Sequence, residues 1–421
     1  MDGAPAEVVE RRRMPLVALL TAQLISLAGN AITLIAVPLY VLATTRSPLA
    51  AGVAGVFATV PVVIGGALGG VIVDRLGYRT SSIIADLASC VTVLAIPVLA
   101  ATVGLPFWAL LLLVFVSGLL DTPGDTARAA FVPDLAELAR TPLARAAGAQ
   151  AAISRSAGML GAAIAGGLVA LTGPIAALVV DAATFGISAI VIALFVPRRA
   201  PRASVEAQPE HYFAGLAAGI RYVWNNRLLR GIVLLVTATN AIDAAGMSVL
   251  KPVYATSVVG DPSALGAMVA CFAGGALTGS VIFAGIGHRF SGRAMFVACF
   301  VLAGVLPYAA MALAVPFAAL VGGLVVSGFA AGALNPMIAT VMYGQVPERM
   351  RARVLGATFA GTAASMPLGA LLAGLAVSAV GLHLTLVGAA VLYGCLTLTP
   401  LLDRSFQQLS EARSPGTPAP A

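Results

Sequence analysis

A short polar loop between two long apolar runs decides the fold, Gly70-Val-Ile-Val-Asp74-Arg75-Leu-Gly77-Tyr-Arg79-Thr80. The apolar runs cover residues 48–73 and 80–103, and each is long enough to cross a bilayer as a helix. The loop is too short to be a domain. We therefore expect its charges to lie at a membrane surface, where helix ends offer dipoles and unpaired backbone groups.

The composition of the whole chain is that of a membrane protein. Of its 421 residues, 60% are hydrophobic and only 10% are charged, whereas soluble chains carry about 25% charged residues. The 45 glycines suit membrane helices that approach one another closely. The four cysteines all fall in apolar runs and show neither metal-ligand spacing nor a disulfide framework.

The apolar pattern predicts an all-α membrane protein with twelve transmembrane helices. At about 1.5 Å per residue, each run can cross a hydrocarbon core of about 30 Å. The runs cover residues 15–44, 48–73, 80–103, 106–132, 144–172, 174–196, 231–258, 263–287, 294–314, 316–345, 354–380 and 383–402.

The basic residues fix the expected orientation. With the N-terminus in the cytoplasm, all of the 24 Lys and Arg residues except Arg46 and Lys251 fall on the cytoplasmic side. This is the positive-inside pattern, and it places both termini in the cytoplasm. The apolar run after Arg11-Arg12-Arg13 is too long for a cleaved signal peptide, so we expect a retained first helix.

The two halves of the chain are related by an internal repeat. A shift of 214 residues aligns Pro48 with Pro262, Gly52 with Gly266 and Arg79 with Arg293. A shift of 208 residues aligns Gly166 with Gly374 and Gly173 with Gly381. We interpret this register as a duplication of a six-helix unit.

The loop resembles the signature between helices 2 and 3 of the major facilitator superfamily of secondary transporters. The matching positions are Gly70, Asp74, Arg75, Gly77 and Arg79, although a generic positive-inside turn is the alternative. The resemblance implies two pseudo-symmetric six-helix bundles that enclose a central cavity and open it to one side at a time.

This interpretation divides the chain into five parts. We expect a cytoplasmic N-terminus (residues 1–14), an N-terminal bundle (15–196) and a C-terminal bundle (231–403), with a disordered cytoplasmic tail (404–421). The polar linker (197–230) ends in a segment with Trp224 and three Arg residues. Either this segment is an amphipathic helix on the inner leaflet or it extends helix 7 into the cytoplasm.

Further stretches resemble the third drug–proton antiporter family of the superfamily, which includes macrolide, Tap-type multidrug and siderophore exporters. The stretches run over residues 127–134, 181–185, 219–230 and 346–356. The resemblance implies efflux of amphiphilic small molecules across a bacterial inner membrane, with a role in multidrug and antibiotic resistance.

Asp243 is the first candidate for proton coupling. A carboxylate inside a membrane is costly, so it is a functional candidate. Asp243 lies about 18 Å along helix 7, near the expected midplane, and Asn240 lies one turn earlier on the same face. The alternative role of Asp243 is a structural hydrogen bond at an irregular part of the helix.

Other polar residues are candidates for the substrate cavity. Gln23 and Asn30 are seven residues apart and share a face of helix 1, which suits either substrate contact or an interhelical hydrogen bond. Asn335 is the repeat counterpart of Asp121 and another candidate. Because Asn30 cannot titrate where many superfamily antiporters carry an acid, the resemblance shifts the coupling role to helix 7.

A second group is predicted to form a conformational switch at the cytoplasmic side. Asp121, Asp125 and Arg128 share one face of helix 4, and Asp86 lies on helix 3. With the signature loop they are expected to form an inner gate in which Arg128 or the start of helix 11 holds Asp74. The alternative is that they line the substrate path.

Helix 5 carries a glycine-rich stretch that resembles the antiporter motif of superfamily exporters. Gly158, Gly161, Gly166 and Gly167 allow close approach of a neighbouring helix. The usual proline of the motif is absent, since Ala162 stands there, and ordinary helix packing explains the glycines equally well.

The sequence favours a proton gradient as the energy source, with no cofactor. It contains no phosphate-binding G-x-x-x-x-G-K-[ST] loop and only one lysine, so we expect no nucleotide partner and no enzymatic activity. The expected partners are amphiphilic small molecules and membrane lipid, without nucleic acid, and the expected state is monomeric. An importer, a siderophore or lysolipid exporter, and a non-transporting scaffold remain alternatives.

Overall fold

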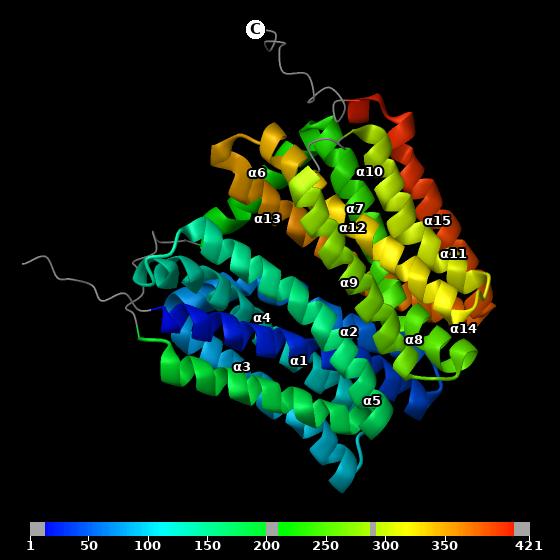
Figure 1. The fold of residues 1–421 in the computed structure, drawn as a ribbon, viewed down its shortest axis with the longest axis horizontal. Helices are drawn as coiled ribbons and strands as arrows, with labels where there is room; N and C mark the ends of the chain where they lie inside the picture. The colour runs from blue at the N-terminus through cyan, green and yellow to red at the C-terminus, as the bar shows by residue number, and fades with distance from the viewer. Residues whose placement is uncertain (1–12, 199–208, 287–291, 408–421) are drawn as a thin grey trace, which may run out of the picture.

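The computed structural model describes residues 13–198, 209–286 and 292–407. These residues are nearly all helical and contain no strand. Figure 1 shows the helices in two groups that spread apart at one end. The longer helices are α1 (Met14–Thr45), α2 (Pro48–Leu76), α3 (Tyr78–Thr102), α4 (Phe107–Leu138), α5 (Leu143–Phe195), α6 (Pro209–Asn225), α7 (Arg227–Ala245), α9 (Ser263–Ile286), α12 (Phe317–Gln345), α13 (Glu348–Ala364), α14 (Met366–Val380) and α15 (Leu382–Leu402).

The remaining elements continue some of these helices. The described residues include eleven spans long and apolar enough to cross a membrane. One of them, Arg227–Val259, joins α7 to π-helical turns around α8 (Lys251–Tyr254). Pro252 has no N–H to donate, and the π-helical register begins just before it, at Gly246. Another span joins α10 (Arg293–Phe300) and α11 (Leu306–Ala312) through a similar turn before Pro307.

The expected break between helices 5 and 6 lies inside α5. This element has 53 residues, about 80 Å of helix, which is far longer than one bilayer crossing. Its backbone leaves the helical region at Gly173, with φ 82° and ψ 165°, just before Pro174. Gly381 has φ 85° and ψ 165° between α14 and α15. The repeat register aligned these two glycines, and both mark the same turn between helices.

The turns at the other end of the repeat also correspond. Arg46 and Gly260 both have left-handed backbone conformations at aligned positions. The next residue then accepts a hydrogen bond from the start of the following helix, Ser47 before α2 and Asp261 before α9. Hydrogen bonds from the Ser263 side chain and backbone lower the pKa of the Asp261 carboxyl.

Two arginines brace the opposite ends of the helices in the same way. Arg79 donates to the backbone carbonyls of Ala193 and Val196 at the end of α5. Its repeat counterpart Arg293 donates to the carbonyl of Pro400 near the end of α15. A cation at a helix C-terminus satisfies carbonyls that lack intrahelical partners and opposes the helix dipole.

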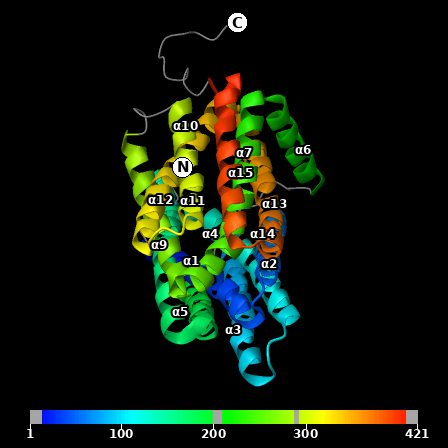
Figure 2. The same cartoon turned by 90° about the vertical axis from the view of Figure 1, so that its right-hand side faces the viewer.

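The α6 segment is a separate helix beside α13 (Figures 1 and 2). It ends at Asn225, and the Asn226 side chain accepts from the Leu229 N–H at the start of α7. The segment is therefore not a continuous extension of α7. The Tyr222 hydroxyl donates to the carbonyl of Gln345, while Trp224 is exposed.

The two groups of helices meet at the end opposite to the one where they spread apart (Figure 1), and glycines form the closest contacts between them. On one side α2 crosses α14, and a Cβ at Gly52 would lie 3.1 Å from the Gly374 Cα. On the other side α5 crosses α9, and a Cβ at Gly166 would lie 2.6 Å from the Gly266 Cα. The four glycines are the two aligned pairs of the repeat, with partners exchanged as a twofold relation requires.

The glycines of the helix 5 stretch have different surroundings. Gly161 packs against the backbone of α1, and Gly166 packs against α9. A Cβ at Gly158 or Gly167 would meet no atom within 4 Å. Close approach of helices therefore explains two of the four glycines.

The α5–α9 crossing should be intolerant of any side chain. In the G266A variant, the added methyl group would overlap the backbone of Gly166, so we expect a loss of about 1–3 kcal/mol in the free energy of unfolding. Chemical or thermal unfolding of the purified protein in detergent measures this change. G167A is the matched control because space is open there; equal stability of the two variants would disprove the crossing.

Candidate functional site

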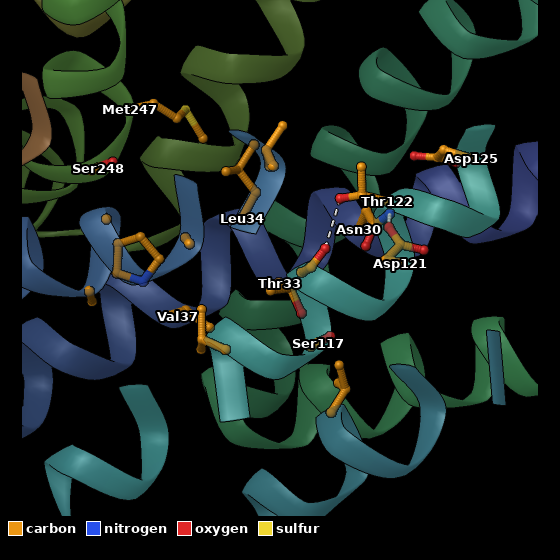
Figure 3. A pocket seen from close by; sticks show the side chains of 18 of the residues that line it. Asn30, Thr33, Leu34, Val37, Ser117, Asp121, Thr122, Asp125, Met247 and Ser248 are labelled. Atoms are coloured by element: carbon orange, nitrogen blue, oxygen red, sulfur yellow. Dashed lines mark hydrogen bonds between the residues drawn. The ribbon is translucent and has the colours of Figure 1, made fainter. Parts of the chain in front are cut away.

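A cavity of about 560 Å³ lies between the two groups of helices (Figure 3). Most of its wall comes from α1, α2, α3 and α4, and the facing wall includes Met247, Ser248 and Phe359. Among the described residues, its polar lining includes two carboxylates and no basic side chain. The lining residues are Asn30, Thr33, Leu34, Val37, Pro38, Ala54, Gly55, Ala58, Val62, Val93, Ile96, Val114, Ser117, Gly118, Asp121, Thr122, Asp125, Thr126, Met247, Ser248 and Phe359.

Helix α1 presents two polar side chains to this cavity, Asn30 and Thr33. The Asn30 amide donates to Asp121 Oδ2 at 2.8 Å. The Thr33 hydroxyl donates to Asp181 Oδ2, and Asp181 is fully buried behind the wall. Two side chains one turn apart on α1 thus bond to carboxylates of two other helices, Asp121 on α4 and Asp181 on α5.

A buried arginine organises the acidic residues. Arg128 and Asp86 are both fully buried, and Arg128 Nη1 lies 2.7 Å from Asp86 Oδ1. Arg128 Nη2 lies 2.8 Å from Asp125 Oδ1 and 3.7 Å from Asp121 Oδ1. The Ser188 hydroxyl donates to the second oxygen of Asp86 at 2.6 Å. The guanidinium group of Arg128 therefore lies within ion-pair distance of three carboxylates.

The carboxylates differ in access to the cavity. The Asp86 side chain is 0% exposed, that of Asp121 is 13% and that of Asp125 is 41%. Asp121 Oδ1 is buried and accepts no hydrogen bond from any residue that the structure describes. The cluster thus extends from a closed ion pair to a carboxylate that a ligand can reach.

The second half of the chain has its own ionisable group near the cavity. Asp243 is exposed and lies one turn before Met247, which lines the cavity. The Tyr393 hydroxyl donates a hydrogen bond to the Asp243 carboxyl group. The positive charge of Lys251 attracts the same carboxyl group. The Lys251 ammonium lies 5.4 Å from the centre of the Phe272 ring, a cation–π arrangement.

The other residues that were expected in the substrate cavity do not line it. Gln23 is buried, its amide donates to Ser154 Oγ at 3.5 Å, and neither residue is among those that line the cavity. Asn240 is half-buried, Asn335 is exposed on α12, and neither is among the residues that line this cavity. Only Asn30 of the expected amides faces it.

The signature loop lies apart from the Arg128 cluster. Gly77 takes a positive φ of 80° between α2 and α3, and Arg75 is exposed. Arg79 is bound to α5 carbonyls. Gly70 lies within α2, the Asp74 side chain is outside the described residues, and Arg128 is bound to acids of α3 and α4.

Sequence reasoning missed the partners that complete these pairs. The sequence patterns did not select Ser188, Lys251 or Thr33, which interact with Asp86, Asp243 and Asp181 respectively. A signal was present on helix 1, where Gln23, Ser26, Asn30 and Thr33 recur at helical spacing and form one polar stripe. Ser26 and Thr33 complete that stripe with hydroxyls directed at Asp86 and Asp181.

Loss of the Arg128 charge should be severe. In R128Q, Asp86 keeps its burial but loses its counter-charge, which costs about 3–5 kcal/mol of stability for a buried pair. Thermal unfolding and membrane yield measure the effect. R75Q removes an exposed arginine and should change little; R128Q as stable as R75Q would show that Arg128 does not hold the cluster.

The chain matches the family model for the transmembrane secretion effector over residues 12–412. It is 30% identical over 407 residues to the multidrug efflux pump Tap of Mycolicibacterium fortuitum, covering 96% of this chain and 99% of the relative. The pump of the same name from Mycobacterium tuberculosis strain H37Rv is 29% identical, with coverage of 95% and 96%.

Solved transporters share the fold. The crystal structure of the nucleoside transporter NupG superimposes with a TM-score of 0.72 at 15% identity, covering 92% of this chain and 98% of that one. A POT family transporter in complex with 5-aminolevulinic acid gives a TM-score of 0.71 at 12% identity, covering 92% and 95%. With eleven apolar spans among its described residues, the chain is a multi-pass protein of the bacterial inner membrane. It belongs to the transmembrane secretion effector family of the major facilitator superfamily.

Proposed function

We propose that the protein is a proton-coupled exporter of amphiphilic small molecules that serves multidrug efflux by alternating access. The cavity carries this proposal, because its wall is largely apolar but contains Asp121 and Asp125, and the lining residues that the structure describes include no basic side chain. Such a wall favours amphiphiles with a positive charge. The relatives named multidrug efflux pumps support the same role and the outward direction.

The proposed topology has twelve crossings, with α5 divided at Gly173 and both termini in the cytoplasm. It groups residues 15–196 and 231–403 into two bundles, joined by the linker 197–230. The positive-inside pattern supports the orientation. The N-terminus 1–12 and the tail 408–421 lie outside the described residues, so the disordered tail stays a prediction.

In this topology the glycine crossings would lie on the external side, and we propose that the conformation is inward-facing. Gly52 packs against Gly374 and Gly166 packs against Gly266, and in the proposed orientation these contacts close the external side. Opening outward would separate these contacts and bring the cytoplasmic ends together. The signature loop with Asp74 is proposed to act in that second state, as a switch between the bundles.

Coupling follows from the charge of the Arg128 cluster. With three carboxylates and one guanidinium, the cluster is negative when every group is ionised. Inside a membrane such an excess must be balanced by a proton or by a bound cation. A cationic substrate at Asp121 and Asp125 would therefore replace protons there, and a proton gradient would supply the energy without a nucleotide or cofactor.

Asp243 is proposed as a further coupling residue in the second half. Met247, one turn further along the helix, lines the cavity, and Tyr393 and Lys251 act on the Asp243 carboxyl from within the protein. Asn240, one turn away, is proposed as its polar neighbour. The monomer contains all of these groups, so a monomeric exporter is sufficient.

Transport into inverted membrane vesicles tests the proposed function. An imposed pH gradient, acid inside, should drive uptake of fluorescent cationic dyes, and collapse of the gradient should stop it. D243N should lose gradient-driven uptake while reaching the membrane in normal amount. D261N is the matched control, since Asp261 lies in a loop. If D243N takes up the dye as well as D261N does, Asp243 has no role in proton coupling.

The charge preference of the cavity can be measured separately. D125N removes the more exposed carboxylate of the cluster. We expect about tenfold weaker binding of tetraphenylphosphonium, equivalent to about 1.4 kcal/mol, and little change for an uncharged amphiphile of similar size. S117A changes a neutral lining residue and serves as the control. Equal weakening for both ligands would show that shape alone selects them.

A further inference from the structure

Asp181 is a buried carboxylate that the proposed mechanism leaves unused. It lies in the second part of α5, at 0% exposure, with Thr33 and Thr184 as its side-chain partners. A Cβ at Gly29 of α1 would lie 2.5 Å from Asp181 Oδ1, so the glycine leaves the room that the carboxylate occupies. The helix packing is thus built around this acid.

No cation neutralises Asp181 among the residues that the structure describes. From α1 the facing groups are the Thr33 hydroxyl and the Gly29 backbone. From α3 they are the thiol of Cys90 and, beyond it, Asp86, which is committed to Arg128 on α4. A buried carboxylate without a counter-cation is stable chiefly in its protonated form.

Asp181 nevertheless has a direct connection to the cavity. Thr33 lines the cavity and its hydroxyl contacts Asp181 Oδ2. One turn earlier, Asn30 lines the same cavity and contacts Asp121 Oδ2. A hydroxyl both donates and accepts, so it can pass a proton between a carboxyl group and water in a cavity, which an amide does poorly.

We propose that Asp181 is a second proton-binding site of the exporter, connected to the cavity through the hydroxyl of Thr33. The inference rests on the proposed proton-coupled export and deepens it. Substrate entry displaces the proton of the Asp121 cluster directly. The Asp181 proton leaves through the Thr33 hydroxyl when the cavity rearranges, and the next proton returns by the same route.

Proton release on ligand binding tests the site. The purified full-length chain in weakly buffered detergent solution is mixed with tetraphenylphosphonium, and a pH indicator counts the protons released per ligand bound. We expect D181N to release one proton fewer than the unaltered protein. Release of the same number by both would overturn the inference. An unaltered protein that binds without releasing protons would instead refute proton coupling itself.

Threonine variants separate a proton route from a structural contact. T33V keeps the carboxylate but removes the hydroxyl between it and the cavity, so stopped-flow proton release should slow about tenfold, the effect of one lost hydrogen bond on a barrier. T33S restores the hydroxyl and should release protons at the unaltered rate.

T184V is the matched control, because Thr184 contacts Asp181 without lining the cavity. It should leave the rate unchanged. Equal slowing in T33V and T184V would show that Asp181 is only a packing group. This comparison decides the question even if D181N fails to fold.

Discussion

The structure depends on one buried cation. Arg128 lies fully inside the first group of helices, and its contacts reach three carboxylates on α3 and α4. A guanidinium suits this position because its planar donors can bind several oxygens at once and it stays charged. The same contacts tie α3 to α4, so stability of the helix group and charge in the cavity wall rest on the same side chain.

The helices and their duplication could be predicted from sequence because they follow from composition and spacing. Apolar runs must cross the membrane as helices, and aligned glycines such as Gly173 and Gly381 take the same backbone conformation. The exchange of partners at the Gly52–Gly374 and Gly166–Gly266 crossings could not be read from the register. It depends on how the two groups dock, which no local pattern contains.

The candidate site was predicted in part for a similar reason. Intramembrane acids are rare, so Asp86, Asp121, Asp125 and Asp243 stand out in the sequence. Their partners do not, because pairing depends on the rotation of each helix about its axis. Arg128 thus meets Asp86 of a neighbouring helix. Serine and threonine partners are harder still to find, since most such residues in membrane helices bond to their own backbone.

The position of the cluster has a consequence for transport. The carboxylates become more accessible from Asp86 through Asp121 to Asp125, all on the wall of one helix group. A bound cation would therefore meet its counter-charge on one side of the cavity and apolar side chains such as Met247 and Phe359 on the other. Rocking of the two groups would change the apolar contacts while the ion pair stays intact. In the proposed proton-coupled mechanism, a proton would have to replace the charge of the substrate for its release, and this requirement would link the direction of transport to the proton gradient.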